Sequence, residues 1–245
     1  MEAKAVWPSP SAPLAIFRDG SSKFPASYRA RWSDHCRLWL QAIPSATLYS
    51  VLDGYTDLPR GKLANVVTYL EMRTPPAAAS SPAMSEYSIR REATPDLDWY
   101  RRLYREIGEP WLWFSRLRLS DDELRAVLHD PKVDVFALSH HGADQGLLEF
   151  DRRCFPDIEL SFFGVIPALI GKGAGRTLLQ QCLPLAWEHQ PQRVWLHTCT
   201  ADHPAALVFY RKFGFIPYKR AIEIADDPRV TGEIPRTAAR HIPII

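Results

Sequence analysis

Residues 158–176 constrain the fold more than any other part of the chain. They begin with an apolar run that ends at Ile166 and has the length and residue types of a buried strand. Gly171, Gly173 and Gly175 then occupy three of five successive positions, and leucines near helical spacing follow. The order of these signals predicts a strand, a glycine-rich turn and a helix.

Such an arrangement binds anions for a physical reason. Glycine lets the backbone approach a ligand closely, and the first N–H groups of a helix have no partner inside it. The helix dipole adds about half a positive charge at that end. We therefore expect a phosphate or pyrophosphate at a loop made of Gly171, Lys172, Gly173, Ala174, Gly175 and Arg176.

Two better-known glycine loops do not fit this stretch. A P-loop needs Ser or Thr directly after its lysine, whereas Lys172 is followed by Gly173. The dinucleotide motif needs G-x-G-x-x-G after an early βαβ unit, whereas the spacing here is G-x-G-x-G. The structural alternative is a plain strand-to-helix turn, in which the glycines are needed only because they can adopt positive φ angles.

A second stretch, residues 202–215, predicts a short helix followed by a strand. Leu207, Tyr210 and Phe213 fall on one side of that helix, and Gly214 is a suitable C-terminal stop.

Together the two stretches resemble the GCN5-related N-acetyltransferases (the GNAT family). That family carries a Q/R-x-x-G-x-G/A loop on the pyrophosphate of acetyl-coenzyme A, which Gly173 and Gly175 match. It also carries an N-x-x-A-x-x-F-Y-x-x-x-G-F segment, matched here by Ala206, Phe209, Tyr210, Gly214 and Phe215. Ile170 departs from the usual Gln or Arg, and His203 departs from the usual Asn, but the backbone donors remain. The resemblance covers about residues 87–224.

The resemblance implies an α/β (α+β) fold with a mixed, mostly antiparallel central sheet. Helices should flank this sheet, which should be splayed between its fourth and fifth strands. The implied cosubstrate is acetyl-CoA, with no metal. The backbone of Phe163, Gly164 and Val165 should meet the pantetheine amides, with a bulge near Gly164 as the opening. The cofactor should also run along His203, Ala206 and Phe209.

Three residues are candidates for proton transfer. Tyr210 is the expected general acid, because a tyrosine with a pKa of about 10 is protonated at neutral pH and it aligns with the family's tyrosine. Glu159 is the expected general base, on a strand whose alternation places Glu159, Ser161 and Phe163 on one face. His197 is the rival base, since a histidine pKa of about 6.5 suits the task.

Trp111, Trp113 and Phe114 are candidates for the wall of the acceptor pocket. The family builds that pocket largely from the region between its first two strands. Burial in an ordinary core explains the same aromatics equally well, because aromatic side chains dominate both cores and pockets.

Composition sets further bounds. The chain has 245 residues, a net charge of +2 and no apolar run that approaches a membrane span. The N-terminus has no apolar block typical of a signal peptide, and the four cysteines are widely scattered. We therefore expect a cytoplasmic protein with free thiols. The adjacent histidines 140 and 141 would point to opposite faces of a strand, so we expect no metal site there.

The chain divides into four parts by pattern. Residues 1–64 are an N-terminal extension, partly helical or poorly ordered, and residues 65–85 are an extra strand and a linker. Residues 86–225 form the GNAT-like domain, and residues 226–245 form a tail that packs along the surface. Arginines and tryptophans in residues 28–42 raise a nucleic-acid hypothesis, but the small net charge favours a helix that docks on the main domain.

Several local signals predict the ends of elements. Residues 94–96 should start a helix that runs to about Ile107, and Ser120 with Glu123 forms a capping box. Residues 140–146 read as a hairpin turn. Pro184 should kink the helix after the glycine loop or end it early.

These observations predict an N-acetyltransferase that moves an acetyl group from acetyl-CoA to a primary amine by direct attack in a ternary complex. The acceptor is an amine-bearing small molecule or a protein amine, and a homodimer is left open. The alternative is a catalytically silent acyl-CoA-binding sensor or interaction module.

Overall fold

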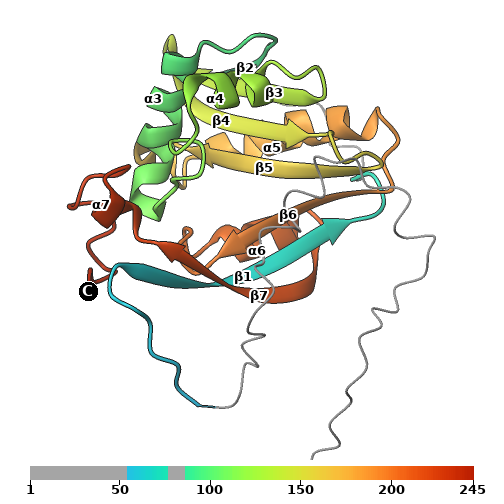
Figure 1. Ribbon diagram of the computed structural model, residues 1–245. Helices are drawn as coiled ribbons and strands as arrows, with labels where there is room; N and C mark the ends of the chain where they lie inside the picture. Colours follow the sequence, from blue (N-terminus) through green and yellow to red (C-terminus); the bar gives the residue numbers. More distant parts are fainter. Residues whose placement is uncertain (1–53, 77–85) are drawn as a thin grey trace, which may run out of the picture.

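The computed structural model describes residues 54–76 and 86–245. In this part of the chain one seven-stranded sheet has the order β2-β3-β4-β5-β6-β1-β7 (Figure 1). Its strands are β1 (Lys62–Met72), β2 (Tyr87–Glu92), β3 (Val133–His140), β4 (Ala143–Asp151), β5 (Asp157–Val165), β6 (Arg193–Cys199) and β7 (Ile216–Asp226).

Helices cover both faces of the sheet. Their bounds are α3 (Leu97–Gly108), η1 (Glu109–Trp111), α4 (Asp121–Leu128), η2 (Pro167–Leu169), α5 (Ala174–Trp187), α6 (Ala206–Lys212) and α7 (Pro228–Thr231). One core cluster joins α3 and α4 to a face of the sheet, and another joins α5 and α6 to the opposite face. The predicted architecture of a mixed sheet flanked by helices is confirmed.

The sheet opens between β5 and β6. These two strands pair in parallel at only three positions, Asp157 with Arg193, Ile158 with Val194 and Glu159 with Trp195, and then diverge (Figure 1). Every other neighbouring pair is antiparallel. Counted from β2, the diverging strands are the fourth and fifth, so the predicted splay is confirmed.

The first described strand, β1, lies between β6 and β7. The β-branched run at residues 65–72 predicts a strand, and β1 begins slightly earlier, at Lys62. What the local pattern does not show is its position: β1 pairs antiparallel with β6 on one edge and with β7 on the other. The strand is therefore part of the central sheet, next to the opening.

Local capping signals agree with the structure. Asp96 accepts a hydrogen bond from the backbone of Trp99 at the start of α3, and both halves of the capping box of α4 are present. The hairpin turn is shorter than predicted, because β3 ends at His140 and β4 begins at Ala143. The helix containing Pro184 continues to Trp187, so it does not end early.

A bulge in β5 overturns the predicted alternation. Glu159 pairs with Asp151 and Leu160 with Phe150, but Glu149 pairs with Phe162, so Ser161 is an extra residue. Beyond it the side chains exchange faces. Glu159 therefore shares its face with Phe162 rather than with Phe163, and the irregularity lies three residues before Gly164.

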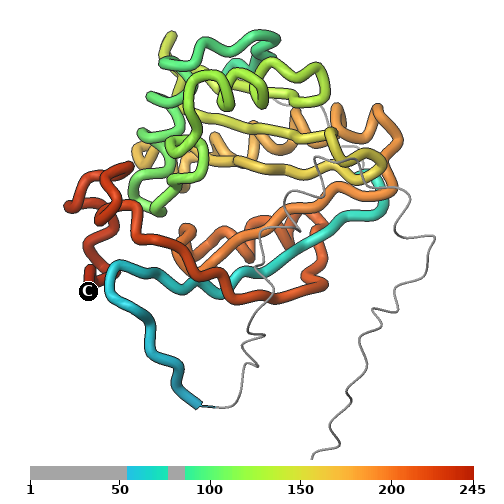
Figure 2. Tube along the Cα trace, viewed as in Figure 1, coloured from blue at the N-terminus to red at the C-terminus, as the bar shows by residue number. Residues whose placement is uncertain are grey.

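The C-terminal tail packs against the region after α3. Ile234, Ala238 and Ala239 form a small buried cluster with Leu112, and Figure 2 shows the tail beside the start of β1. Arg229 fixes the tail by donating to the carbonyl oxygens of residues 238, 239 and 242. The tail is thus held against the body of the domain by an apolar cluster and by Arg229.

Three further predictions concern the rest of the chain. Cys182 and Cys199 are free, but Cys154 is disulfide-bonded, so the prediction of free thiols is wrong for that residue. The helix predicted for residues 28–42 lies outside the described residues. In the described part, no helix has both the length and the apolar character of a membrane span.

Candidate active site

A cavity of about 580 Å³ occupies the opening between β5 and β6. It brings together most of the residues that the sequence singles out, from η1, β5, α5, β6, α6 and the loops beside them. Those lining it are Trp111, Trp113, Phe114, Phe163, Gly164, Val165, Gly171, Gly173, Gly175, Arg176, His197, His203, Ala206, Phe209 and Tyr210. Glu159, Lys172 and Ala174 do not line it.

The glycine loop is shaped to accept an anion. Gly171 and Gly173 have φ values of 79° and 87°, which L-residues rarely adopt, and a Cβ at either would meet nothing within 4 Å. Gly173 caps α5 with no side-chain hydrogen bond from the described residues. The first-turn N–H groups of α5 are therefore open towards the cavity. The hydroxyl of Tyr87 donates to the carbonyl of Lys172 at 3.1 Å and holds the loop.

An aromatic wall continues from the loop towards α6. A Cβ on Gly175 would lie 3.4 Å from the Phe163 ring, so glycine lets β5 and α5 approach here. Phe163 stacks on Phe209 with ring centroids 5.4 Å apart and an interplanar angle of 18°. These rings give the middle of the cavity an apolar lining, suited to an extended chain of low charge.

Beyond Glu159, β5 pairs with β4 alone, so its other edge borders the cavity. An edge strand of this kind presents backbone N–H and C=O groups to a ligand. Gly164 serves a different purpose from the predicted bulge. A Cβ there would lie 2.5 Å from Ile107 and 3.2 Å from the Trp113 ring, so glycine lets α3 and Trp113 pack against β5.

Tyr210 lies at the inner wall of the cavity and is 8% exposed. Its ring packs edge-on against Phe163 and Phe215. Burial raises the pKa of its hydroxyl, with a smaller contribution from the negative charge of Asp202. The phenol is therefore protonated at neutral pH, as a proton donor must be.

Glu159 lies directly opposite Asp151 across β4 and β5. Burial, and then repulsion from Asp151, raise the pKa of Glu159 to about 8. Asp151 itself pairs with Arg153, at 2.6 Å from Nη2 to Oδ2. The negative charge of Asp151 therefore disfavours ionisation of Glu159, which is mostly protonated at pH 7.

His197 stands between Glu159 and the cavity. Its Nδ1 lies 3.8 Å from a carboxylate oxygen of Glu159, and its side chain is 48% exposed. Close packing on one side desolvates the ring and lowers the pKa of His197 below its usual value. The imidazole is therefore neutral at pH 7 and able to take a proton.

Asp202 is a site residue that the sequence analysis missed. One carboxylate oxygen accepts from Thr198 Oγ1 at 2.7 Å and from the Cys199 N–H at 2.8 Å. The other accepts from Trp113 Nε1 at 3.4 Å. Asp202 thus ties the end of β6 to the segment after α3. An aspartate just after a strand is a common turn signal, so sequence alone offered no reason to prefer a binding role.

Other missed residues come from β1 and β7. Asn65 and Glu223 face each other across these strands and both line the cavity. The amide of Asn65 donates to Glu223 at 3.4 Å. Their contribution follows from the insertion of β1 beside β6, which no local signal predicts.

A buried ion pair supports the floor of the site. Glu149 is fully buried and accepts hydrogen bonds from Arg116 and, at 2.6 Å, from the hydroxyl of Tyr100. The Arg116 guanidinium lies 4.8 Å from the centroid of Phe162. The pair fixes β4 and β5 against α3 beneath the cavity.

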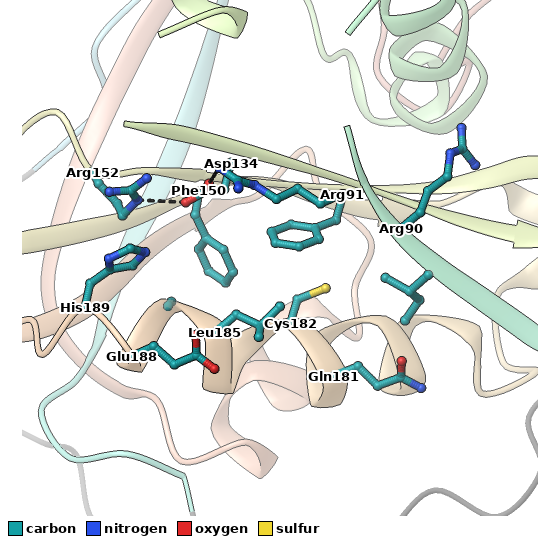
Figure 3. A pocket seen from close by; sticks show the side chains of 13 residues that line it. Arg90, Arg91, Asp134, Phe150, Arg152, Gln181, Cys182, Leu185, Glu188 and His189 are labelled. Atoms are coloured by element: carbon teal, nitrogen blue, oxygen red, sulfur yellow. Dashed lines mark hydrogen bonds and ion pairs between the residues drawn. The ribbon is translucent and has the colours of Figure 1, made fainter. Parts of the chain in front are cut away.

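A second cavity, of about 530 Å³, lies between α5 and strands β2, β3 and β4 (Figure 3). Three of its charged residues pair, since Arg91 and Arg152 both bind Asp134. Phe150 and Leu185 add apolar surface to its lining. It contains none of the site residues predicted from the sequence.

Potential metal ligands are dispersed in the structure. Among residues 54–76 and 86–245, no group of three or more His, Cys, Asp or Glu side chains is arranged to hold an ion.

Comparison with known proteins identifies one family. Residues 95–215 match the model of the acetyltransferase (GNAT) family. No curated protein matches the chain.

Solved structures of low similarity include a conserved protein of unknown function from Staphylococcus epidermidis, with 13% identity and a TM-score of 0.47, covering 68% of this chain and 64% of that one. A GCN5-related N-acetyltransferase from Sphaerobacter thermophilus has 16% identity and a TM-score of 0.48, covering 66% of this chain and 51% of that one. An aminoglycoside acetyltransferase from an uncultured soil metagenomic sample has 20% identity and a TM-score of 0.44, covering 52% and 86%. This chain thus spans less than two thirds of the first two, and likenesses this weak assign no substrate.

Proposed function

This chain carries an acetyltransferase domain of the GNAT family, and from that premise we propose that it moves an acetyl group from acetyl-CoA to a primary amine. The amine attacks directly in a ternary complex. The observation that supports this most strongly is a single cavity that runs from the glycine loop past Tyr210 to His197.

The residues present fit acetyl-CoA. The open N-terminus of α5 and Arg176 suit its pyrophosphate, and the free edge of β5 suits its pantetheine amides. The aromatic wall of Phe163 and Phe209 suits the aliphatic part of the arm. When bound, this cosubstrate supplies an acetyl thioester.

The proton transfers of the reaction assign a role to each polar residue. The acceptor enters as an ammonium, and neutral His197, whose ring lies beside Glu159, takes its proton. The free amine forms the new C–N bond at the acetyl carbon while the C–S bond breaks. The Tyr210 hydroxyl protonates the departing thiolate, and the nitrogen that has formed the amide gives up its second proton, which restores the phenol. Cys199 takes no part, because burial raises the pKa of its thiol to about 12.

The substitution Tyr210→Phe tests this assignment. We expect the rate of acetyl transfer, measured as thiol release with a panel of amines, to fall about 100-fold or more, which is typical of losing a general acid. The dissociation constant of CoA, measured by calorimetry, should change less than about threefold because the ring remains. Tyr55→Phe is the control, since Tyr55 is fully exposed and lies outside the cavity.

Two results would contradict the proposal. Thiol release that is unchanged in Tyr210→Phe would remove the tyrosine from the chemistry. Tight CoA binding by the wild type without turnover of any amine would favour the alternative, a silent acyl-CoA-binding module.

A further inference from the structure

Four aromatic rings form a continuous strip on one face of β6, β1 and β7. Tyr69 is at its centre, with ring centroids 6.2 Å from Trp195, 5.8 Å from His197 and 6.2 Å from Tyr218. Tyr69 and Trp195 are half-buried, whereas His197 and Tyr218 are exposed. A row of rings that solvent still reaches is unusual on a sheet face and typical of a binding surface.

The strip begins inside the cavity. His197 lines the cavity and contacts Tyr69. Tyr69 itself lies outside the cavity. Register places Tyr69 opposite both His197 and Lys219, so these three side chains share one face of the sheet. Along β1 and β7 the same face carries Asn65 and Glu223 at the mouth of the cavity. A ligand that extends out of the cavity along the sheet would therefore lie on these rings.

The charges around the strip favour a cation. Glu223 forms no ion pair with a Lys or Arg among the described residues, and its carboxylate accepts a hydrogen bond from Asn65. Its charge helps to raise the pKa of the Tyr69 hydroxyl, after burial and Tyr218.

Other acids near the strip are already neutralised. Glu71 and Asp157 both bind Arg193, and Glu71 also binds Arg73. Of the described acids near the strip, Glu223 is thus one that no Lys or Arg neutralises.

The protein already places an ammonium group on this strip. Lys219 Nζ lies 4.6 Å from the centroid of Tyr69, a distance typical of a cation–π contact. Moving an exposed lysine side chain away from the ring costs little free energy. A cation of a ligand can therefore replace its ammonium group over Tyr69. Stacked nucleic-acid bases fit the rings less well, because their phosphates would meet Glu223.

We propose that the rings of Tyr69, Trp195 and Tyr218 in this strip bind a second cationic group of the acceptor, which is therefore an alkyl diamine or polyamine. The inference rests on the proposed acetyl transfer and adds a substrate class to it. One ammonium enters the cavity and reacts, while the other lies over Tyr69 in place of Lys219.

A matched pair of acceptors tests the inference. Cadaverine and n-pentylamine have the same carbon chain and differ in one terminal ammonium. We expect the wild type to acetylate cadaverine with the lower KM. The substitution Tyr69→Leu should raise KM for cadaverine about 3- to 30-fold, the range of one cation–π contact, and leave kcat and the KM for pentylamine unchanged.

Lys219→Gln should act in the opposite direction, because it removes the competing ammonium. KM for cadaverine should fall about threefold, again with little change for pentylamine. Tyr55→Leu is the control, since Tyr55 is fully exposed and lies outside both the strip and the cavity. Thermal unfolding and CoA binding verify that each variant is folded. If Tyr69→Leu does not fold, the KM values of Lys219→Gln alone test the inference.

The outcomes separate the two proposals. Acetylation of both amines with the same KM, unaffected by Tyr69→Leu or Lys219→Gln, would overturn the polyamine inference and leave acetyl transfer intact. Absence of thiol release with either amine and with the wider panel would overturn acetyl transfer, and the inference with it.

Discussion

Replacing Glu159 by glutamine removes a carboxyl group that the fold keeps protonated. Burial and the facing Asp151 raise the pKa of Glu159 from 4.5 to about 8. In the unfolded chain this carboxyl ionises near its ordinary value, so the unfolded state binds fewer protons between these two pH values. Stability is therefore lost as pH rises from about 4.5 to 8, and the substitution Glu159→Gln abolishes that loss.

The magnitude follows from the pKa change. At about 1.36 kcal/mol per pKa unit, the upper limit is about 5 kcal/mol at pH 9. Because solvent reaches 27% of the Glu159 side chain, we discount this to about 2 kcal/mol. At pH 4.5 the difference between wild type and Glu159→Gln should be below about 0.5 kcal/mol.

Urea unfolding at pH 4.5, 7 and 9 measures these differences. Glu71→Gln is a control on the same face of the sheet, for which the change in stability with pH should have the opposite sign. Hydrogen bonds from Arg73 and Arg193 outweigh burial and lower the pKa of Glu71. That substitution should destabilise the protein at pH 7 and 9, and the effect should shrink as pH falls below about 4.5.

One result would refute the reasoning on Glu159. If Glu159→Gln changes the free energy of unfolding equally at all three pH values, the carboxyl group is not held protonated by the fold. The facing pair with Asp151 would then not control its ionisation.

Three further substitutions have expected outcomes. Gly164→Ala should lower the free energy of unfolding by about 1–3 kcal/mol in urea denaturation, because its Cβ would lie 2.5 Å from Ile107; an unchanged midpoint would contradict the close packing. Gly173→Asp should weaken CoA binding in calorimetry at least tenfold more than Gly173→Ala, since both strain the same φ of 87° and only one adds negative charge; equal affinities would place the pyrophosphate elsewhere. Ser120→Ala should cost about 1 kcal/mol in thermal unfolding through the lost capping box of α4, and no loss would mean that the cap is not needed.

Much of the fold could be predicted because the signals are local. The helix start at Asp96 and the capping box at Ser120 each involve residues within one turn, so a short window contains all the partners. The glycine loop and the segment around Tyr210 likewise carry their chemistry in consecutive residues. The structure then brings both to one cavity, as the family resemblance implies.

The part of the cavity lined by β1 and β7 could not be predicted for a physical reason. Asn65 and Glu223 are 158 positions apart, and they meet only because β1 pairs with β7. Strand neighbours depend on loop closure and burial across the whole sheet, which alternation within one strand does not encode.

The position of Glu159 shows a similar limit. One extra residue, Ser161, reverses the face on which every later side chain of β5 lies. Nothing in the composition of residues 158–166 marks the bulge, so the face of Glu159 relative to Phe163 was predicted wrongly.

The place of β1 has a consequence for biosynthesis. β7 pairs only with β1 in the described part of the chain, and the two are its first and last strands. In a nascent chain leaving the ribosome, β1 stays unpaired with β7 until β7 is synthesised. The pairing of β1 with β7 has a high contact order, which slows folding. A fragment that starts at Tyr87 would leave β6 with a bare edge and β7 with no neighbour, and we expect it to aggregate.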